Sequence, residues 1–123
     1  MIKNWEIIRE ILVRLEESLT PNTELNAKII SAFPEQDVAY NMRLLHDAGY
    51  ISAVFLETDG AEGLINFAHA KHLTNAGHEL LEIMRNKTVW GKVKETFKTK
   101  GLEMSFDLVT TVGKKIMETI LSS

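Results

Sequence analysis

The sequence predicts an α+β fold that is mostly helical, and three observations support this class. Apolar residues recur at helical spacing through most of the 123-residue chain. One central stretch is instead rich in β-branched and aromatic residues, and a glycine-containing turn divides it into two strands, as in a hairpin. The chain also lacks an internal repeat and a low-complexity linker, which favours a single domain.

A first helix is predicted from about Asn4 to Glu17. Its stripe of core-facing positions is apolar at helical spacing: Trp5, Ile8, Leu12, Leu15 and Leu19. Asn4 is a suitable N-cap, and the turn residues Thr20-Pro21-Asn22 end the element. The next segment, Thr23 to Ile30, alternates apolar and polar residues, so it fits either a short strand or a helical turn.

A second helix is predicted from Pro34 or Glu35 to about Ala48. Proline suits the first turn of a helix, and acidic residues there favour the positive end of the helix dipole. Three apolar residues supply the buried stripe, namely Val38, Met42 and Leu45. Gly49 is placed to end this helix in a left-handed conformation.

A β-hairpin follows, with strands predicted over Tyr50 to Glu57 and Leu64 to Ala70. The residues between the strands, 58–63, contain two glycines among polar and small residues, which is typical of a turn. After the hairpin, Thr74 or Asn75 is expected to cap a further helix.

The rest of the chain is predicted to be helical. The segment 86–88 is expected to break or bend the helix that follows the hairpin. Helical spacing resumes from Val89 to Phe97, and Gly101 stops it. Ser105 then caps a last helix that continues to Leu121.

The order helix, short extended piece, helix, hairpin and helix is that of a winged helix. Leu44-Leu45-His46-Asp47-Ala48-Gly49-Tyr50-Ile51 resembles the end of the recognition helix and the first wing strand of MarR-type regulators. Leu73-Thr74-Asn75-Ala76-Gly77-His78-Glu79-Leu80-Leu81 is similar to the segment that follows the wing in those proteins. This resemblance implies a winged-helix core over residues 1–85, and residues 86–123 are expected to form a helical extension packed on that core or in a dimer.

A second resemblance involves the stretch from Gly77-His78-Glu79 through Thr88-Val89-Trp90 to Lys94. It looks like an uncharacterised winged-helix family of phages and prophages that includes YjcQ-like proteins, and the likeness covers residues 2 to about 120. It implies a small protein of phage or mobile-element origin, and it implies no particular activity.

Composition places limits on the class of protein. The absence of cysteine excludes disulfides and thiolate metal sites. The N-terminal residues lack the order of a signal peptide, and the longest apolar stretch, Ala48 to Leu56, is far shorter than the roughly 20 residues of a membrane helix. We therefore expect a cytoplasmic protein without a membrane partner.

The net charge of −3 is unevenly distributed along the chain. Residues 1–84 carry 6 Lys/Arg and 13 Asp/Glu, whereas residues 85–123 carry 8 and 4. The basic excess lies between Arg85 and Lys100, and such a segment is either a site that attracts phosphate or the solvated face of a surface helix.

Binding of double-stranded DNA, as by a small transcriptional regulator, is the first functional hypothesis. The outward face of the second helix is expected to present four side chains that can contact bases or phosphates: Gln36, Tyr40, Asn41 and Arg43. Two lysines of the basic segment, Lys92 and Lys94, are expected to add phosphate contacts. The chain departs from DNA-binding relatives in two respects. Only about 17 residues, without a clear helix, separate the first two predicted helices, and the expected wing tip carries Asp59 and Glu62.

A winged-helix module that binds a host or phage protein instead of DNA is the alternative. The acidic N-terminal part and the amphipathic last helix, Ser105 to Leu121, support it, and that helix either folds back or forms a homodimer. An enzyme is not expected, and no catalytic residue, cofactor or metal ligand is assigned. The histidines His46, His69, His72 and His78 do not have the spacing of a metal motif.

Overall fold

The computed structural model describes residues 2–17, 25–57 and 65–122. The fold is α+β and mostly helical, as predicted. The chain divides into two compact units, Met1–His78 and Glu79–Ser123, and each is described by itself. The division falls near the start of a helix, seven residues before the boundary after residue 85 that the sequence suggested, which stays a prediction.

The first unit begins with α1 (Trp5–Glu16), close to the predicted bounds. Asn4 is its N-cap, since its side-chain oxygen accepts hydrogen bonds from the backbone N–H groups of Glu6 and Ile7 at 2.9 and 3.3 Å. The apolar stripe of the helix is buried through Ile7, Ile8, Ile11, Leu12 and Leu15.

The segment between α1 and α2 contains both of the structures that its sequence allowed. β1 (Leu25–Asn26) is a two-residue strand, and the 3₁₀ helix η1 (Ala27–Ile29) follows it directly. The Asn26 side chain caps η1 by accepting the Lys28 N–H at 2.9 Å. In the described residues between α1 and α2, the chain therefore forms a two-residue strand and a 3₁₀ turn and no α-helix.

α2 (Glu35–Asp47) also agrees with the prediction, and it buries Val38, Ala39, Asn41, Met42 and Leu45. It ends at Ala48, and Gly49 follows with a φ of 85°, in the left-handed region. The glycine therefore turns the chain from the helix directly into the sheet.

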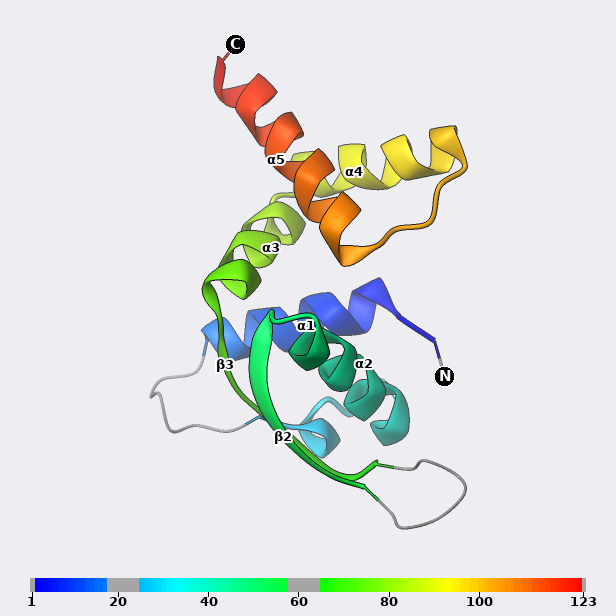
Figure 1. Cartoon of the computed structure of the whole chain (residues 1–123), viewed down its shortest axis with the longest axis vertical. Coiled ribbons are helices and arrows are strands. Elements are labelled where there is room, and N and C mark those ends of the chain that lie inside the picture. Colours follow the sequence, from blue (N-terminus) through cyan, green and yellow to red (C-terminus); the bar gives the residue numbers. More distant parts are fainter. Residues whose placement is uncertain (1, 18–24, 58–64, 123) are drawn as a thin grey trace. The chain divides into compact units, whose positions relative to one another are not determined.

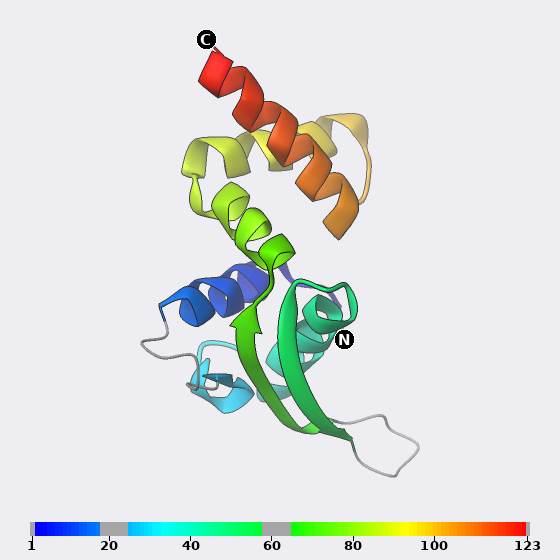
Figure 2. The ribbon, with the colours of Figure 1, turned by 60° about the vertical axis from the view of Figure 1, so that its left-hand side comes forward.

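Within the described ranges, the sheet has three antiparallel strands in the order β1-β3-β2. β2 (Ile51–Glu57) and β3 (Ile65–Leu73) form the predicted hairpin, with β3 extending three residues beyond the expected end. In Figures 1 and 2 this long, curved hairpin lies against the two helices, with α1 beside β3 and α2 beside β2. The turn predicted over residues 58–63 lies outside the described residues.

The base of the hairpin is held closed by contacts between the residues that precede β2 and follow β3. The Thr74 hydroxyl donates to the carbonyl oxygen of Gly49 at 2.7 Å and accepts the N–H of Gly77 at 3.1 Å. The Thr74 N–H donates to the carbonyl oxygen of Tyr50 at 3.1 Å. Gly77 lies directly against that carbonyl, where a Cβ atom would collide with it. Thr74 thus caps the next helix, as predicted, and also joins it to the end of α2.

The first unit, in the order α1-β1-η1-α2-β2-β3, has a layout consistent with a winged-helix-like fold. The two helices pack on the hairpin, and the hairpin follows the second helix after only three residues.

The second unit contains most of α3 (Asn75–Arg85), together with α4 (Lys87–Lys100) and α5 (Phe106–Ser122). The break expected at residues 86–88 is present, because Asn86 caps α4 through hydrogen bonds from the N–H groups of Thr88 and Val89. Gly101 ends α4 with a φ of 65°, and the Ser105 hydroxyl accepts the Leu108 N–H at 3.2 Å at the start of α5. α4 packs on α5, and Gly113 of α5 lies against the side chain of Ile83 in α3.

Candidate nucleic-acid interface

Gln36, at the start of α2, has its side-chain amide paired with the backbone of β3. Its Nε2 donates to the Ile65 carbonyl oxygen at 2.8 Å, and its Oε1 accepts the Ile65 N–H at 3.1 Å. These two bonds use the donor and the acceptor with which an amide would recognise adenine. Gln36 therefore positions the first residue of β3, and its amide is not available to a base.

Asn41 lies in the core, with 0% of its surface exposed. Its Oδ1 accepts the Asn4 N–H at 2.8 Å, and its Nδ2 donates to the carbonyl oxygens of Asp37 at 2.8 Å and Ile2 at 3.4 Å. A side chain buried in this way cannot reach a base edge, so the sequence-based role of Asn41 is corrected. It joins α2 to the N-terminal segment and to the cap of α1.

Tyr40 and Arg43, the other two candidates of α2, are half-buried. The Arg43 guanidinium lies 5.4 Å from the centroid of the Phe55 ring, and its Nε is 3.5 Å from a carboxylate oxygen of Asp47. Because an acidic group accompanies this arginine, its pull on a phosphate is reduced. Tyr40 and Arg43 remain the two predicted residues of α2 that a ligand could contact.

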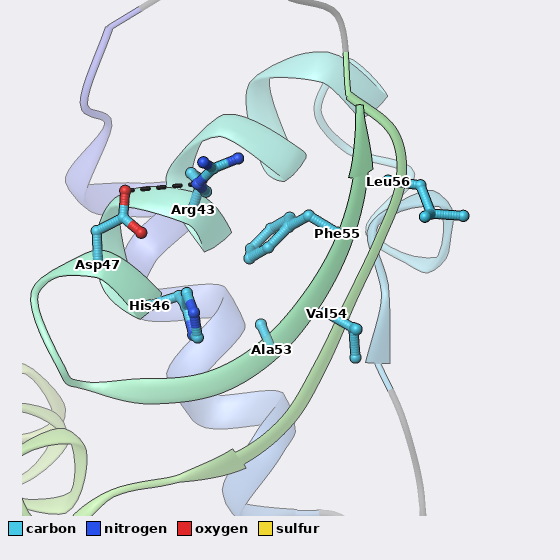
Figure 3. A pocket seen from close by; sticks show the side chains of 7 residues that line it. All are labelled: Arg43, His46, Asp47, Ala53, Val54, Phe55 and Leu56. Atoms are coloured by element: carbon cyan, nitrogen blue, oxygen red, sulfur yellow. Dashed lines mark ion pairs between the residues drawn. The ribbon is translucent and has the colours of Figure 1, made fainter. Parts of the chain in front are cut away.

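A groove lies beside Arg43, between α2 and β2 (Figure 3). Its lining residues are Arg43, His46 and Asp47 of α2 and Ala53, Val54, Phe55 and Leu56 of β2. The His46 ring, exposed on the groove side of the helix, is tilted against Phe55 with ring centroids 5.6 Å apart. His46 is not among the residues predicted for a site, because only the return of β2 along α2 brings it next to an aromatic ring.

Lys92 and Lys94 are both exposed on α4 in the second unit. Residues two positions apart in a helix point about 200° apart around its axis, so these two lysines lie on opposite flanks of α4. Lys92 lines a shallow pocket with Glu95, Lys100 and Ile116, whereas Lys94 lies over the Trp90 ring at 5.9 Å. The structure therefore does not bring the two predicted lysines together.

A different set of lysines shares one flank of α4. Lys87, Lys94 and Lys98 are spaced by seven and four residues, which places them on one side of the helix, and all three are exposed. Exposed Gly91 lies between them on the same flank, where a Cβ atom would have no neighbour within 4 Å. We call Lys87, Gly91, Lys94 and Lys98 the basic flank of α4. The spacing of these lysines is a signal that the sequence carries, and Lys87 and Lys98 lie within the basic segment but are not among the predicted site residues.

The histidines of the sheet have structural contacts. The Asn26 side-chain amide lies 2.7 Å from Nε2 of His69, and the His69 ring stacks on Phe67 with centroids 4.2 Å apart. In residues 2–17, 25–57 and 65–122, no three histidine, aspartate or glutamate side chains are grouped so that they could hold a metal ion. Within the same ranges, no helix is long and apolar enough to cross a membrane.

Residues 3–103 match the family model described as "Hypothetical protein (DUF2513)". The chain belongs to the DUF2513 family. One relative of this DUF2513 chain is a Haemophilus influenzae protein described as "Uncharacterized protein". The two sequences are 36% identical over 122 residues, which cover 99% of this chain and all of the relative. No solved structure matches the chain. The expected membership of an uncharacterised family is thus confirmed, while the resemblances to YjcQ-like proteins and MarR-type regulators stay predictions.

Proposed function

We propose that this DUF2513 protein is a winged-helix protein that binds double-stranded DNA and acts as a small transcriptional regulator. The observation that carries the proposal is the basic flank of α4, where three exposed lysines share one side of the helix. Lysines arranged along one side of a helix suit the regular spacing of phosphates on a duplex. The winged-helix-like layout of the first unit supports the same proposal.

In this proposal the two units have different tasks. The lysines of α4 bind phosphates, and this gives affinity that depends on salt and not on sequence. Tyr40 and Arg43 are the remaining candidates for contact with base edges, because the amides of Gln36 and Asn41 are bonded within the protein. We therefore expect sequence preference to be weak compared with the electrostatic component of binding.

The test is a titration of a fluorescently labelled duplex with the full chain, followed by anisotropy from low to physiological salt. A double variant, Lys94→Ala with Lys98→Ala, removes two charges from the basic flank. We expect it to weaken binding at low salt and to reduce the slope of log K against log salt by about 1.8, since each phosphate contact contributes about 0.9. A wild-type chain that leaves the duplex free even at low salt would refute the proposal.

A matched control removes the same amount of charge elsewhere. Lys28 of η1 and Lys115 of α5 are exposed and lie off the basic flank. The Lys28→Ala, Lys115→Ala double variant should keep the wild-type salt slope. Equal losses in the two double variants would mean that only net charge matters, and the assignment to α4 would then be wrong.

A protein-binding module is the second candidate function, and the surface of α2 favours it. Of the four residues predicted on this helix, two are engaged internally and Arg43 is accompanied by Asp47. The β2–β3 hairpin also exposes apolar side chains, Val54, Leu56 and Phe67. If the duplex titration fails, the winged helix is proposed to bind a host or phage protein, and the dimer through the C-terminal helices remains a separate prediction.

A further inference from the structure

β2 lies at the edge of the sheet, and among the described residues no strand lies on one side of its backbone. In the part of the chain that the structure describes, β3 is the only strand paired with β2. An edge strand presents backbone N–H and C=O groups that can pair with another strand. Soluble proteins commonly protect such an edge with lysine, proline or a cover of other chain segments.

The edge of β2 lacks these protective residues. From Ile51 to Leu56 it contains neither lysine nor proline, and Val54 and Leu56 are 42% and 63% exposed. The register with β3 is irregular at both ends, but Ala53–Leu56 pairs without interruption with Phe67–Ala70. A regular, apolar stretch of four residues is therefore available for pairing.

The groove beside α2 runs along this edge. The groove has a volume of about 470 Å³, and four consecutive residues of β2, Ala53–Leu56, line it. Consecutive residues of a strand point to opposite faces, so all four can border one groove only where it follows the strand edge. Figure 3 shows this alternation, with Phe55 pointing toward α2 and Leu56 pointing away from it.

We propose that the occupant of this edge is β2 of a second copy of the chain, paired antiparallel about a twofold axis through Phe55. Residues directly opposite in an antiparallel pair point to the same face of the sheet, so Val54 can face only Val54 or Leu56 among the exposed residues of the other copy. An axis through Phe55 sets Val54 against Leu56 twice, and it joins the two most exposed apolar side chains of the strand.

The charges in the groove are self-complementary. Arg43 and Asp47 contribute one cation and one anion beside the edge, 3.5 Å apart at their nearest atoms. A twofold axis through Phe55 brings the Arg43 side chains of the two copies toward each other, because each lies 5.4 Å from that ring, and the Asp47 carboxylate beside each arginine offsets their repulsion. Residues 1–78 carry 6 Lys/Arg and 11 Asp/Glu, so repulsion between copies opposes pairing at low salt. The pairing is expected to strengthen at physiological salt, which screens charges beyond roughly 8 Å.

Cysteine cross-linking tests the register, because the chain contains no cysteine of its own. Val54→Cys mixed with Leu56→Cys should give an oxidised heterodimer, since the two positions face each other across the axis. Each variant alone should stay uncross-linked, because equal positions are then displaced along the strands. Cross-linking of either variant alone, or failure of the mixture to cross-link, would overturn the proposed register.

Sedimentation of the full chain tests the association itself. Leu56→Lys places a charge on the exposed edge without disturbing the core, and it should weaken dimerisation at least about tenfold because the contact occurs twice. The control is Leu121→Lys in α5, at a position that is 82% exposed, and it should leave the dimer unchanged. A wild-type chain that stays monomeric at high concentration, or a dimer lost only in the Leu121 variant, would refute pairing through β2.

Discussion

Replacement of Asn41 by alanine should destabilise the protein strongly and leave any DNA contact of the folded chain intact. The side chain makes three hydrogen bonds in the core, to the Asn4 N–H and to the carbonyl oxygens of Asp37 and Ile2. Each such bond contributes about 1 kcal/mol net, so the variant should lose about 3 kcal/mol. That loss is a large share of the roughly 5–15 kcal/mol that stabilises a small protein.

Urea unfolding followed by circular dichroism measures this loss. With a slope of about 1.5 kcal/mol per molar urea, the midpoint should fall by about 2 M. Asn75→Ala is the matched control, because Asn75 is exposed at the start of α3. The unfolding free energy of this variant should differ from that of wild type by no more than about 0.5 kcal/mol. An Asn41 variant with an unchanged midpoint and lost duplex binding would return Asn41 to the role of reading a base.

Three further substitutions test packing and backbone positioning. Gly77→Ala should cost about 3 kcal/mol in a thermal melt, because its Cβ would strike the Tyr50 carbonyl oxygen; a melting temperature equal to that of wild type would exclude this close approach. Gln36→Ala should cost about 2 kcal/mol and speed amide exchange at the first residue of β3, which would stay slow if the two hydrogen bonds were unimportant. In Gly113→Ala the new Cβ should collide with Ile83, whose side-chain carbons would lie 2.6–2.9 Å from it, and the protein should lose stability. Ile83→Val should recover about 1 kcal/mol of that lost stability in a double-mutant cycle. Additive effects of the two substitutions would argue against the contact.

Gly91→Ala is the control for both glycine substitutions. Gly91 lies within α4, and its surroundings leave room for a methyl group. The change should therefore stabilise the helix by up to about 1 kcal/mol, through propensity alone. A destabilised Gly91 variant would show that glycine replacement is harmful here for reasons other than crowding.

Local signals allowed most of the fold to be predicted from the sequence. Caps and left-handed turns depend on a few neighbouring residues, so the sequence predicts them well. Four predicted residues act at the expected helix ends: Asn4, Gly49, Gly101 and Ser105. The ambiguous segment after α1 resolved into a two-residue strand and a 3₁₀ turn, because pairing with β3 selects the extended form for Leu25 and Asn26.

The candidate site was less predictable, because the partners of its amides are distant in the sequence. Asn41 is bonded to Asn4, 37 residues away, and Gln36 to Ile65, 29 residues away. A helical projection places both at the border of the apolar stripe, where a polar side chain can face solvent or join a buried network. Only the packing of α2 against the N-terminal segment and β3 decides between these outcomes.

The closed base of the hairpin has a consequence for how the protein can change in evolution. Thr74, Gly77 and the Gly49–Tyr50 turn fix the ends of β2 and β3 relative to each other. The alignment of the two strands is thus set where they enter and leave the helices, and it does not depend on the length of the connection between them. We therefore expect residues inserted or deleted between Glu57 and Ile65 to leave the strand pairs at the base of the hairpin unchanged.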